Sequence, residues 1–119
     1  MNITMATLGN FTQQQVFEKV AAHLLTQNAK STGGRDKSCR YRGEDGRMCA
    51  AGCIISNDEY SVGMENLSWT VVIFPEAHRH MIVTLQKIHD MHDVNRWPES
   101  LINLAENYGL DTNFMLTLK

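Results

Sequence analysis

Apolar and polar positions recur with a helical period in three separate segments of the chain. In the first segment the apolar residues fall three and four positions apart, and polar residues occupy the opposite side. Thr12 followed by Gln15 is the signature of a capping box, and Phe11 and Val16 are placed to form a hydrophobic staple. The pattern predicts a helix over residues 13–27. Its core-facing residues are expected to be Val16, Phe17, Val20, Ala21, Leu24 and Leu25.

Two further helices are predicted in the second half of the chain. Pro75 suits the first position of a helix, and apolar residues then line one face to about residue 91. Pro98 suits a second helix start, and Gly109 suits a left-handed cap at its end. The predicted helices cover residues 75–91 and 98–108.

A β-hairpin is predicted between the first two helices. The tetrapeptide GEDG lies between two short runs with partial alternation, which is typical of a hairpin turn. Cys39 and Tyr41 are expected on one face of the first strand, and Arg40 and Arg42 on the other. The hairpin is expected over residues 39–51.

Four other segments have weaker patterns. The β-branched run LSWTVVIF, residues 67–74, favours a buried strand, although its length also allows a helix. Ser56 and Glu59 form a second capping-box signature, which predicts a short helix that ends at Gly63. The alternation in the C-terminal NFMLTLK is compatible with an edge strand. Residues 1–9 have no clear period and are expected to form a loose arm.

Composition places the chain among small globular domains. Its 119 residues are 43% hydrophobic and 20% charged, which is enough to bury one core but not two. The predicted fold is therefore a mostly helical α+β single domain that spans residues 1–119. The net charge of -2 gives neither the basic field of a nucleic-acid binder nor the acidic field of a DNA mimic. The absence of a long apolar run and of a secretion signal predicts a cytoplasmic protein with no membrane partner.

The three cysteines raise the question of a metal site. An odd number in a cytoplasmic protein favours free thiols or a metal over disulfides. The spacing C-x9-C-x3-C departs from the paired C-x2-C of zinc ribbons, whereas H-D-M-H can place two imidazoles on nearly the same helical face. A zinc-stabilised binding module is therefore an alternative to packing of the thiols in the core, which we favour. The candidate ligands are Cys39, Cys49, Cys53, His89 and His92.

A catalytic thiol requires a cysteine beside a histidine, with a third group that orients the histidine. Cys49 or Cys53 with His89 and Asp93 is the trio that the sequence offers, and neither cysteine lies in a recognisable nucleophile motif. We therefore expect no enzymatic activity and no cofactor. An enzyme with a reactive cysteine remains the second alternative.

Basic residues gather before and within the predicted hairpin. The preceding segment NAKSTGGRDKS, residues 28–38, is typical of a mobile polar loop and matches neither the phosphate loop nor the dinucleotide fingerprint. Strand alternation would place these cations on one side, where they could contact an acidic protein face or a phosphate. Pairing with Glu44, Asp45 or nearby acids is an equally good alternative. The candidate partner-binding residues are Lys30, Arg35, Lys37, Arg40, Arg42 and Arg47.

From Thr12 to about Asp111, the order of motifs resembles a set of small proteins encoded by tailed phages, prophages and some bacteria. The matching motifs are TQQQVFEKVAAHLLTQNAKS, CRYRGEDGRMCAAGCII followed by DEY, LQKIHD, and RWPESLINLAENYGLD. The resemblance implies a phage-type setting and a shared fold but supplies no catalytic residues, because the set has no established activity.

Small accessory proteins of phages often bind host machinery, which is a functional association and not a property of the fold. We therefore expect a non-enzymatic protein that binds a host protein or a protein–nucleic acid complex in the host cytoplasm. One possible role of such a protein is the inhibition of a host defence system, as in anti-CRISPR proteins. Nucleic acid alone is not an expected partner, because the chain has no basic field.

Overall fold

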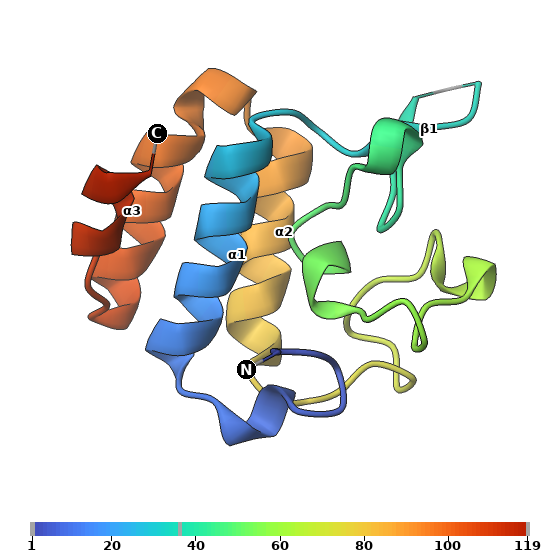
Figure 1. Cartoon of the computed structure of the whole chain (residues 1–119), viewed down its shortest axis with the longest axis horizontal. Helices are drawn as coiled ribbons and strands as arrows, with labels where there is room; N and C mark the ends of the chain where they lie inside the picture. The colour runs from blue at the N-terminus through green and yellow to red at the C-terminus, as the bar shows by residue number, and fades with distance from the viewer. Residues whose placement is uncertain (1, 36, 119) are drawn as a thin grey trace.

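The computed structural model describes residues 2–35 and 37–118, which form a three-helix bundle with an irregular lobe against one side (Figure 1). The α-helices of this part are α1 (Gln13–Gln27), α2 (Arg79–Met91) and α3 (Trp97–Tyr108). Helix α3 contacts both α1 and α2, and the lobe lies on the side of the bundle away from α3. The predicted mostly helical α+β fold is confirmed. None of the described helices combines the length and apolar character needed to cross a membrane.

Helix α1 begins and ends as the sequence predicts. The backbone N–H of Gln15 donates to the Thr12 hydroxyl at 3.1 Å, and the N–H of Thr12 donates to the Gln15 side chain at 2.9 Å. This reciprocal capping box satisfies two amides that the first turn leaves unpaired. The helix ends at Asn28, whose φ of 51° is left-handed. The side chains that it buries completely are Val16, Phe17, Val20, Ala21 and Leu24.

Helix α2 ends at the predicted residue but begins four residues later than Pro75. His78 lies immediately before the helix with φ 56°, a left-handed conformation through which a right-handed helix cannot continue. Its ring Nε2 lies 2.7 Å from the carbonyl oxygen of Phe11. This tie between the start of α2 and the segment before α1 stabilises the conformation that the sequence pattern did not reveal.

Helix α3 begins one residue before Pro98, which lies in its first turn. Gly109 ends it in the predicted left-handed conformation, with φ 68°. The N–H of Leu110 donates to the Ala105 carbonyl at 2.8 Å and closes the last turn. The predicted helix and its cap are both confirmed.

The hairpin lies earlier in the chain than residues 39–51. Its strands are β1 (Thr32–Gly33) and β2 (Ser38–Cys39), which pair antiparallel, so part of the predicted mobile loop forms the first strand. The predicted GEDG turn keeps a single bridge between Arg42 and Met48. Asp45 and Gly46, with φ 60° and 73°, are both left-handed within this turn, and the Gly43 N–H donates to the Arg47 carbonyl at 2.9 Å.

Ser31 takes the place of the missing ladder bonds. Its hydroxyl lies 2.8 Å from the carbonyl oxygen of Arg40 and 3.2 Å from that of Arg47. A buried side chain thus joins the two runs that were expected to pair through their backbones. The central hairpin is a two-residue ladder followed by a loop that side chains hold together.

The predicted strand over residues 67–74 is wrong. This segment forms consecutive turns, in which the N–H of Val71 donates to Ser68 and that of Phe74 donates to Val71. Trp69 and Phe74 are buried and stack with ring centroids 4.5 Å apart, whereas Val72 is 90% exposed. The apolar run therefore packs through two aromatic rings and not through a strand face.

The remaining weak patterns also differ from expectation. Ser56 and Glu59 do form both hydrogen bonds of a capping box, at 2.9 and 3.2 Å, but the chain continues as a single turn and not as a helix. The C-terminal segment Asn113–Thr117 is a 3-10 helix and not an edge strand. Its Phe114 ring packs edge-on against Phe17 of α1, 5.7 Å away, and Met115 also packs against the core, whereas Leu116 is exposed.

Residues 2–9 are packed against the lobe and do not form a loose arm. Leu8 is fully buried, and Ile3 is 9% exposed. The backbone N–H groups of Met5 and Ala6 donate to the two carboxylate oxygens of Glu59, at 3.1 and 2.9 Å. Charge-assisted bonds of this kind stabilise a segment whose regular structure is limited to a turn and the start of the short 3-10 helix Leu8–Asn10.

Gly52 should tolerate no side chain, because a Cβ there would overlap the carbonyl of Tyr41. We predict that Gly52→Ala lowers the free energy of unfolding by more than about 2 kcal/mol, since backbone atoms must move apart. Gly63→Ala is the matched control, because its Cβ would meet only the Ser61 hydroxyl, at 3.8 Å. Urea unfolding followed by circular dichroism measures both. Equal stability of the two variants would contradict the close approach.

Candidate functional site: a cleft at the base of the hairpin

A cleft of about 360 Å³ lies where the hairpin and the 65–69 turn meet helix α2. Its apolar wall is formed by Tyr41, Cys49, Leu67, Trp69 and Val83. Its polar wall includes Cys39, Glu65, Gln86, Lys87 and Asp90. The volume lies at the lower end of the range for small-molecule sites, so this cleft is the first place to examine for binding or chemistry.

Behind the polar wall, the buried ring of His89 joins the lobe to α2. The Ser31 backbone N–H donates to Nε2 at 2.9 Å, and Nδ1 lies 2.7 Å from an Asp90 carboxylate oxygen. A backbone amide can only donate, so Nε2 accepts and the proton of the ring is on Nδ1. The ring is completely buried and stacks on Trp97, with centroids 5.5 Å apart. Both nitrogens are therefore committed to structural bonds.

The Asp90 carboxylate accepts hydrogen bonds from three residues, two on its own helix and one on β2. Besides His89, the Gln86 side-chain amide donates to it at 2.7 Å, and the Cys39 thiol forms a further hydrogen bond. Burial raises the pKa of the Asp90 carboxyl, but these hydrogen bonds outweigh burial and hold its pKa below the ordinary value. Gln86 also accepts from the Ala51 N–H at 2.8 Å. Asp90 is thus a charged centre around which the lobe is fixed.

Only part of the predicted metal set comes together. Among residues 2–35 and 37–118, a group of three possible ligands occurs once, where Cys39, His89 and Asp90 place ligand atoms within 4.8 Å of one another. Zinc would require His89 to lose the Nδ1 proton while Nε2 still accepts from Ser31, or to break one of these bonds. The residues in this arrangement do not fit a zinc ion.

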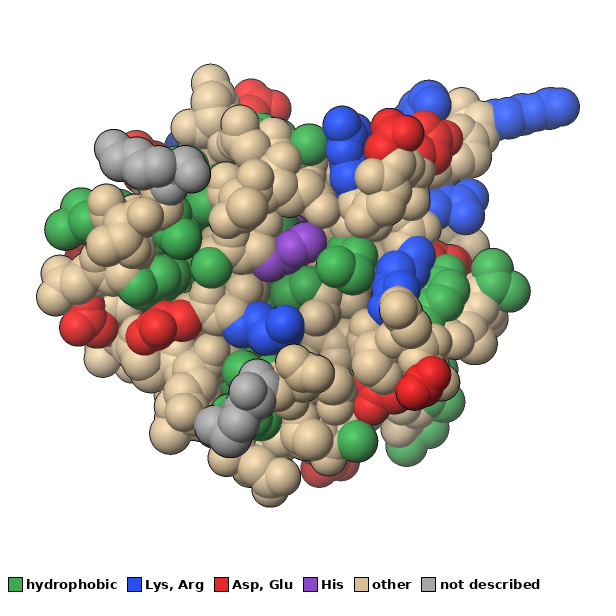
Figure 2. All heavy atoms as spheres, viewed as in Figure 1, with side chains coloured by type: hydrophobic (Ala, Val, Ile, Leu, Met, Phe, Trp, Pro, Cys, Tyr) green, Lys and Arg blue, Asp and Glu red, His purple; other side chains and the backbone are tan. Residues whose placement is uncertain are grey.

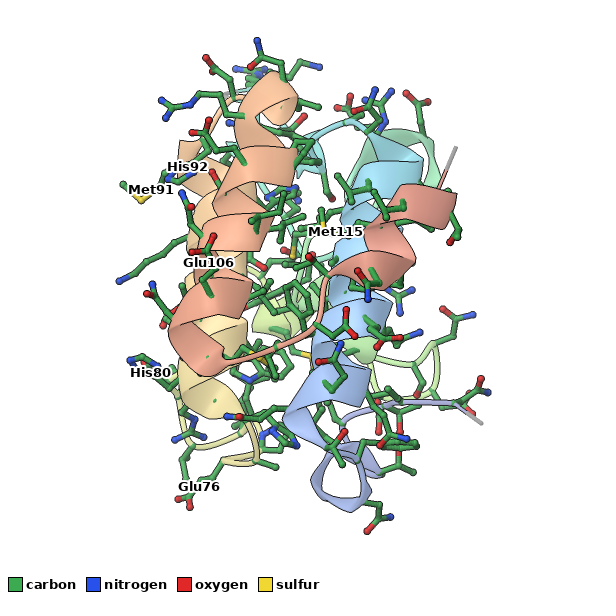
Figure 3. All side chains as sticks on the ribbon, turned by 90° about the vertical axis from the view of Figure 1, so that its left-hand side faces the viewer. Glu76, His80, Met91, His92, Glu106 and Met115 are labelled. Atoms are coloured by element: carbon green, nitrogen blue, oxygen red, sulfur yellow. The ribbon has the colours of Figure 1, made fainter. Side chains whose placement is uncertain are left out.

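The other predicted ligands have separate partners. The Cys53 thiol donates to the Ala50 carbonyl at 3.1 Å, and Cys49 is buried and accepts from the Gly52 N–H at 3.3 Å. His92 Nδ1 lies 2.6 Å from the Ser100 hydroxyl, at the far side of the bundle, where Figure 3 shows His92 beside Met91. The helical spacing of His89 and His92 therefore does not place their rings at one metal site.

The thiols have properties opposite to those of activated nucleophiles. Burial, reinforced by the charge of Asp90, raises the pKa of Cys39 to about 11. Burial raises the pKa of Cys53 to about 12 and raises that of Cys49 further. His89 pairs with Asp90, and not with the Asp93 of the predicted catalytic trio. Thiolates at these positions are scarce near neutral pH.

Three of the six predicted basic residues are held by the protein itself. Lys30 donates to the Asp90 carbonyl at 3.2 Å. Arg42 donates to Asn57 and to the Ile55 carbonyl, and its guanidinium lies 5.0 Å from the centre of the Tyr60 ring. The Arg40 side chain packs flat on Gly33 and is also half-buried, which makes it a structural part of the hairpin.

The other three basic residues are exposed. Lys37 pairs with Glu44 at 3.2 Å, as the pairing alternative anticipated, and the surface over this end of the lobe mixes basic and acidic side chains (Figure 2). Arg35 and Arg47 are exposed, and their guanidinium groups donate to no described residue. The contact surface that remains is therefore smaller than the sequence suggested.

Several residues of the cleft were missed by the sequence analysis. Gln86 and Asp90 are four residues apart in one helix, a spacing that signals contact but not a site. Glu65 accepts from the backbone amides of Tyr41 and Arg42, at 3.0 and 3.1 Å. Nothing in the local sequence points to this long-range pairing.

Comparisons with protein-family models, curated proteins and solved structures give no match to this chain. The geometry of its own residues is therefore the basis for assigning a function.

Acid should unfold the protein partly through Asp90. Because its folded-state pKa is lowered, the stabilisation is present above about pH 4 and is lost as the pH falls through the folded-state pKa. We predict that Asp90→Asn costs about 1.5–3 kcal/mol at neutral pH and flattens the fall in stability below about pH 4. Urea unfolding at a series of pH values measures both effects.

Asp58→Asn is the control for this experiment, since Asp58 is exposed. It should leave both the stability and the pH profile close to those of the parent chain. An Asp90→Asn profile parallel to that of the parent would contradict the assigned role of Asp90.

Proposed function

We propose that this chain is a non-enzymatic accessory protein of phage type that binds a macromolecule of the bacterial host through the end of its β1–β2 hairpin. The target that we propose is a host protein or a protein–nucleic acid complex. In the most specific version of the proposal, the target is a host defence complex that the chain inhibits. The motifs shared with small phage-encoded proteins support the setting. The observation that supports the surface is the placement of Arg35 and Arg47.

The hairpin stands at the edge of the molecule, away from the helical bundle (Figure 1). Arg35, in the turn of this hairpin, and Arg47, after the 44–46 turn that Lys37 contacts through Glu44, are exposed, and their side chains have no acceptor among the described residues. Guanidinium groups form bidentate bonds with carboxylates and phosphates, and such bonds are strongest where a partner removes water. Two exposed arginines without an acceptor in the described part of the chain are therefore suited to an acidic partner surface.

Lys37 adds to this surface although it is paired. Its bond to Glu44 joins two exposed side chains, and pairs of this kind contribute little to stability. A partner carboxylate can replace Glu44 at low cost. The basic contact surface that we propose consists of Arg35, Lys37 and Arg47.

The overall charge agrees with a local contact and not with general binding to nucleic acid. The chain carries a net charge of -2, so no long-range field attracts a polyanion. Specific recognition would depend on a few arginines at short range, as in many interfaces where arginine dominates the binding energy. A folded partner with an acidic patch matches this arrangement better than bare nucleic acid does.

Charge reversal of the exposed arginines tests the proposal. The tagged chain is used to capture proteins from a bacterial lysate, and the captured set is quantified by mass spectrometry. A specific partner of the parent chain should be lost at least tenfold on Arg35→Glu or Arg47→Glu, since each change removes a favourable pair and adds a repulsion of about 1–2 kcal/mol. The partner is then purified and its affinity is measured by calorimetry.

Arg96→Glu is the matched control. Arg96 is exposed at the start of α3 and pairs with Glu99 at 3.5 Å, so the change in charge is the same but the position is different. This variant should keep the partner. Equal capture by all three variants, with circular dichroism spectra that match the parent, would contradict the proposed surface.

A further inference from the structure

The cleft beside α2 contains a buried hydrogen-bond donor that the protein does not satisfy. Trp69 lines the cleft and is only 2% exposed, and its indole Nε1 has no hydrogen-bond partner in the described chain. Buried polar groups are nearly always paired, because an unpaired donor loses its hydration without compensation. An unpaired donor in the wall of a cleft points to a ligand that accepts from it.

The second tryptophan of the chain provides a comparison, because its indole N–H does form a hydrogen bond. Trp97 is also fully buried, and its Nε1 donates to the His92 carbonyl at 3.2 Å. The two indoles therefore have similar burial but differ in their hydrogen bonding. The exception is the one that lies in the cleft.

The carboxylates of the cleft are already in use. Glu65 accepts from two backbone amides and also from the Tyr60 hydroxyl at 2.7 Å. Asp90 accepts from Gln86, His89 and Cys39. A ligand that brings donors would compete with these internal bonds, whereas a ligand that brings acceptors would not.

A cation at the rim of the cleft adds a further hydrogen-bond donor without a partner. Lys87 is exposed, lines the cleft and donates to no described residue. Ammonium groups bind carboxylate and phosphate oxygens as point charges. The groups of the cleft that have no partner among the described residues therefore include the Trp69 indole N–H, the buried Nε of Arg40 and the Lys87 ammonium, and all three prefer an anionic oxygen.

One wall of the cleft is apolar, and this limits the size and kind of ligand. Tyr41, Leu67 and Val83 offer carbon surface, and the volume of about 360 Å³ suits a molecule of one or two rings. A sulfate-sized anion would leave this apolar wall uncovered. We propose that the cleft is a binding site for a small aryl carboxylate, whose ring lies against the apolar wall and whose oxygens accept from Trp69 and Lys87.

Access to the indole N–H requires a small shift of the turn that carries it. Nε1 has almost no exposed surface, so the ligand oxygen must displace the 66–69 segment as it enters. Asn66 in this segment has φ 69°, a conformation that costs energy for a residue other than glycine, and it is exposed. Within this turn the Leu67 carbonyl accepts from the Tyr41 hydroxyl, so this bond must shift with the segment or break when the ligand enters.

Indole resonances report this binding directly. Benzoate, phenylacetate and 1-naphthoate are titrated into the 15N-labelled full chain to about 10 mM, which covers the weak affinity expected of such small ligands. The matching neutral amides are titrated in parallel. We expect saturable movement of the Trp69 Nε1–H resonance with at least one acid, while the Trp97 resonance stays in place. The amide of that acid should bind at least threefold more weakly.

Two exposed lysines separate the role of charge from that of shape. Lys87→Gln should weaken the acid about threefold and leave the amide unchanged, since an exposed ion pair contributes modestly. Lys19→Gln on α1 is the control, because Lys19 does not line the cleft. Val83→Trp, which fills the cleft, should abolish the Trp69 shift with every probe.

Two outcomes would overturn the assignment. If no acid moves the Trp69 resonance, or if Trp97 moves equally, the cleft is not the site. If acids and amides bind alike, or if Lys87→Gln has no effect, the anionic class is wrong. Neither outcome bears on the arginine surface of the hairpin, so this inference stands or falls independently of the proposed function.

Discussion

The structure depends on one buried histidine ring that bonds to two different parts of the chain. His89 accepts from the Ser31 amide beside the hairpin and donates to Asp90 on its own helix, at 2.9 and 2.7 Å. The ring is fully buried, so loss of either bond would leave an unpaired polar group, at a cost of about 1–3 kcal/mol. Asp90 then extends the connection to Cys39. These bonds fix the hairpin against α2 and thereby shape the cleft between them.

In the lobe, side chains satisfy the backbone hydrogen-bonding groups that a β-sheet satisfies in most α+β folds. The ladder of β1 and β2 is only two residues long, so most backbone amides of the lobe need other partners. Glu59, Glu65 and Gln86 supply acceptors across long stretches of sequence. This arrangement leaves the two proposed surfaces separate. Arg35 lies in the turn between β1 and β2 and Arg47 follows the 44–46 turn, and neither residue lines the cleft.

Local signals in the sequence predicted the helices. The structure of the lobe and of the candidate site depends on long-range pairings. The Thr12 capping box and the Gly109 cap depend on neighbouring residues, so both could be found from the sequence. The start of α2 could not, because it depends on the bond between His78 and the distant Phe11. The candidate ligands Cys39 and His89 do meet, but Asp90 and the two committed ring nitrogens change what they can do. Trp69 gave no signal as part of a site, because its missing partner is visible only in three dimensions.

The protonation of the His89 ring tests the central claim most directly. A long-range proton–nitrogen NMR correlation near neutral pH distinguishes the two ring nitrogens and shows which one carries the proton. The account predicts a neutral ring with the proton on Nδ1, and a scalar coupling between Nε2 and the Ser31 amide across their hydrogen bond. A proton on Nε2, alone or together with one on Nδ1, would contradict it.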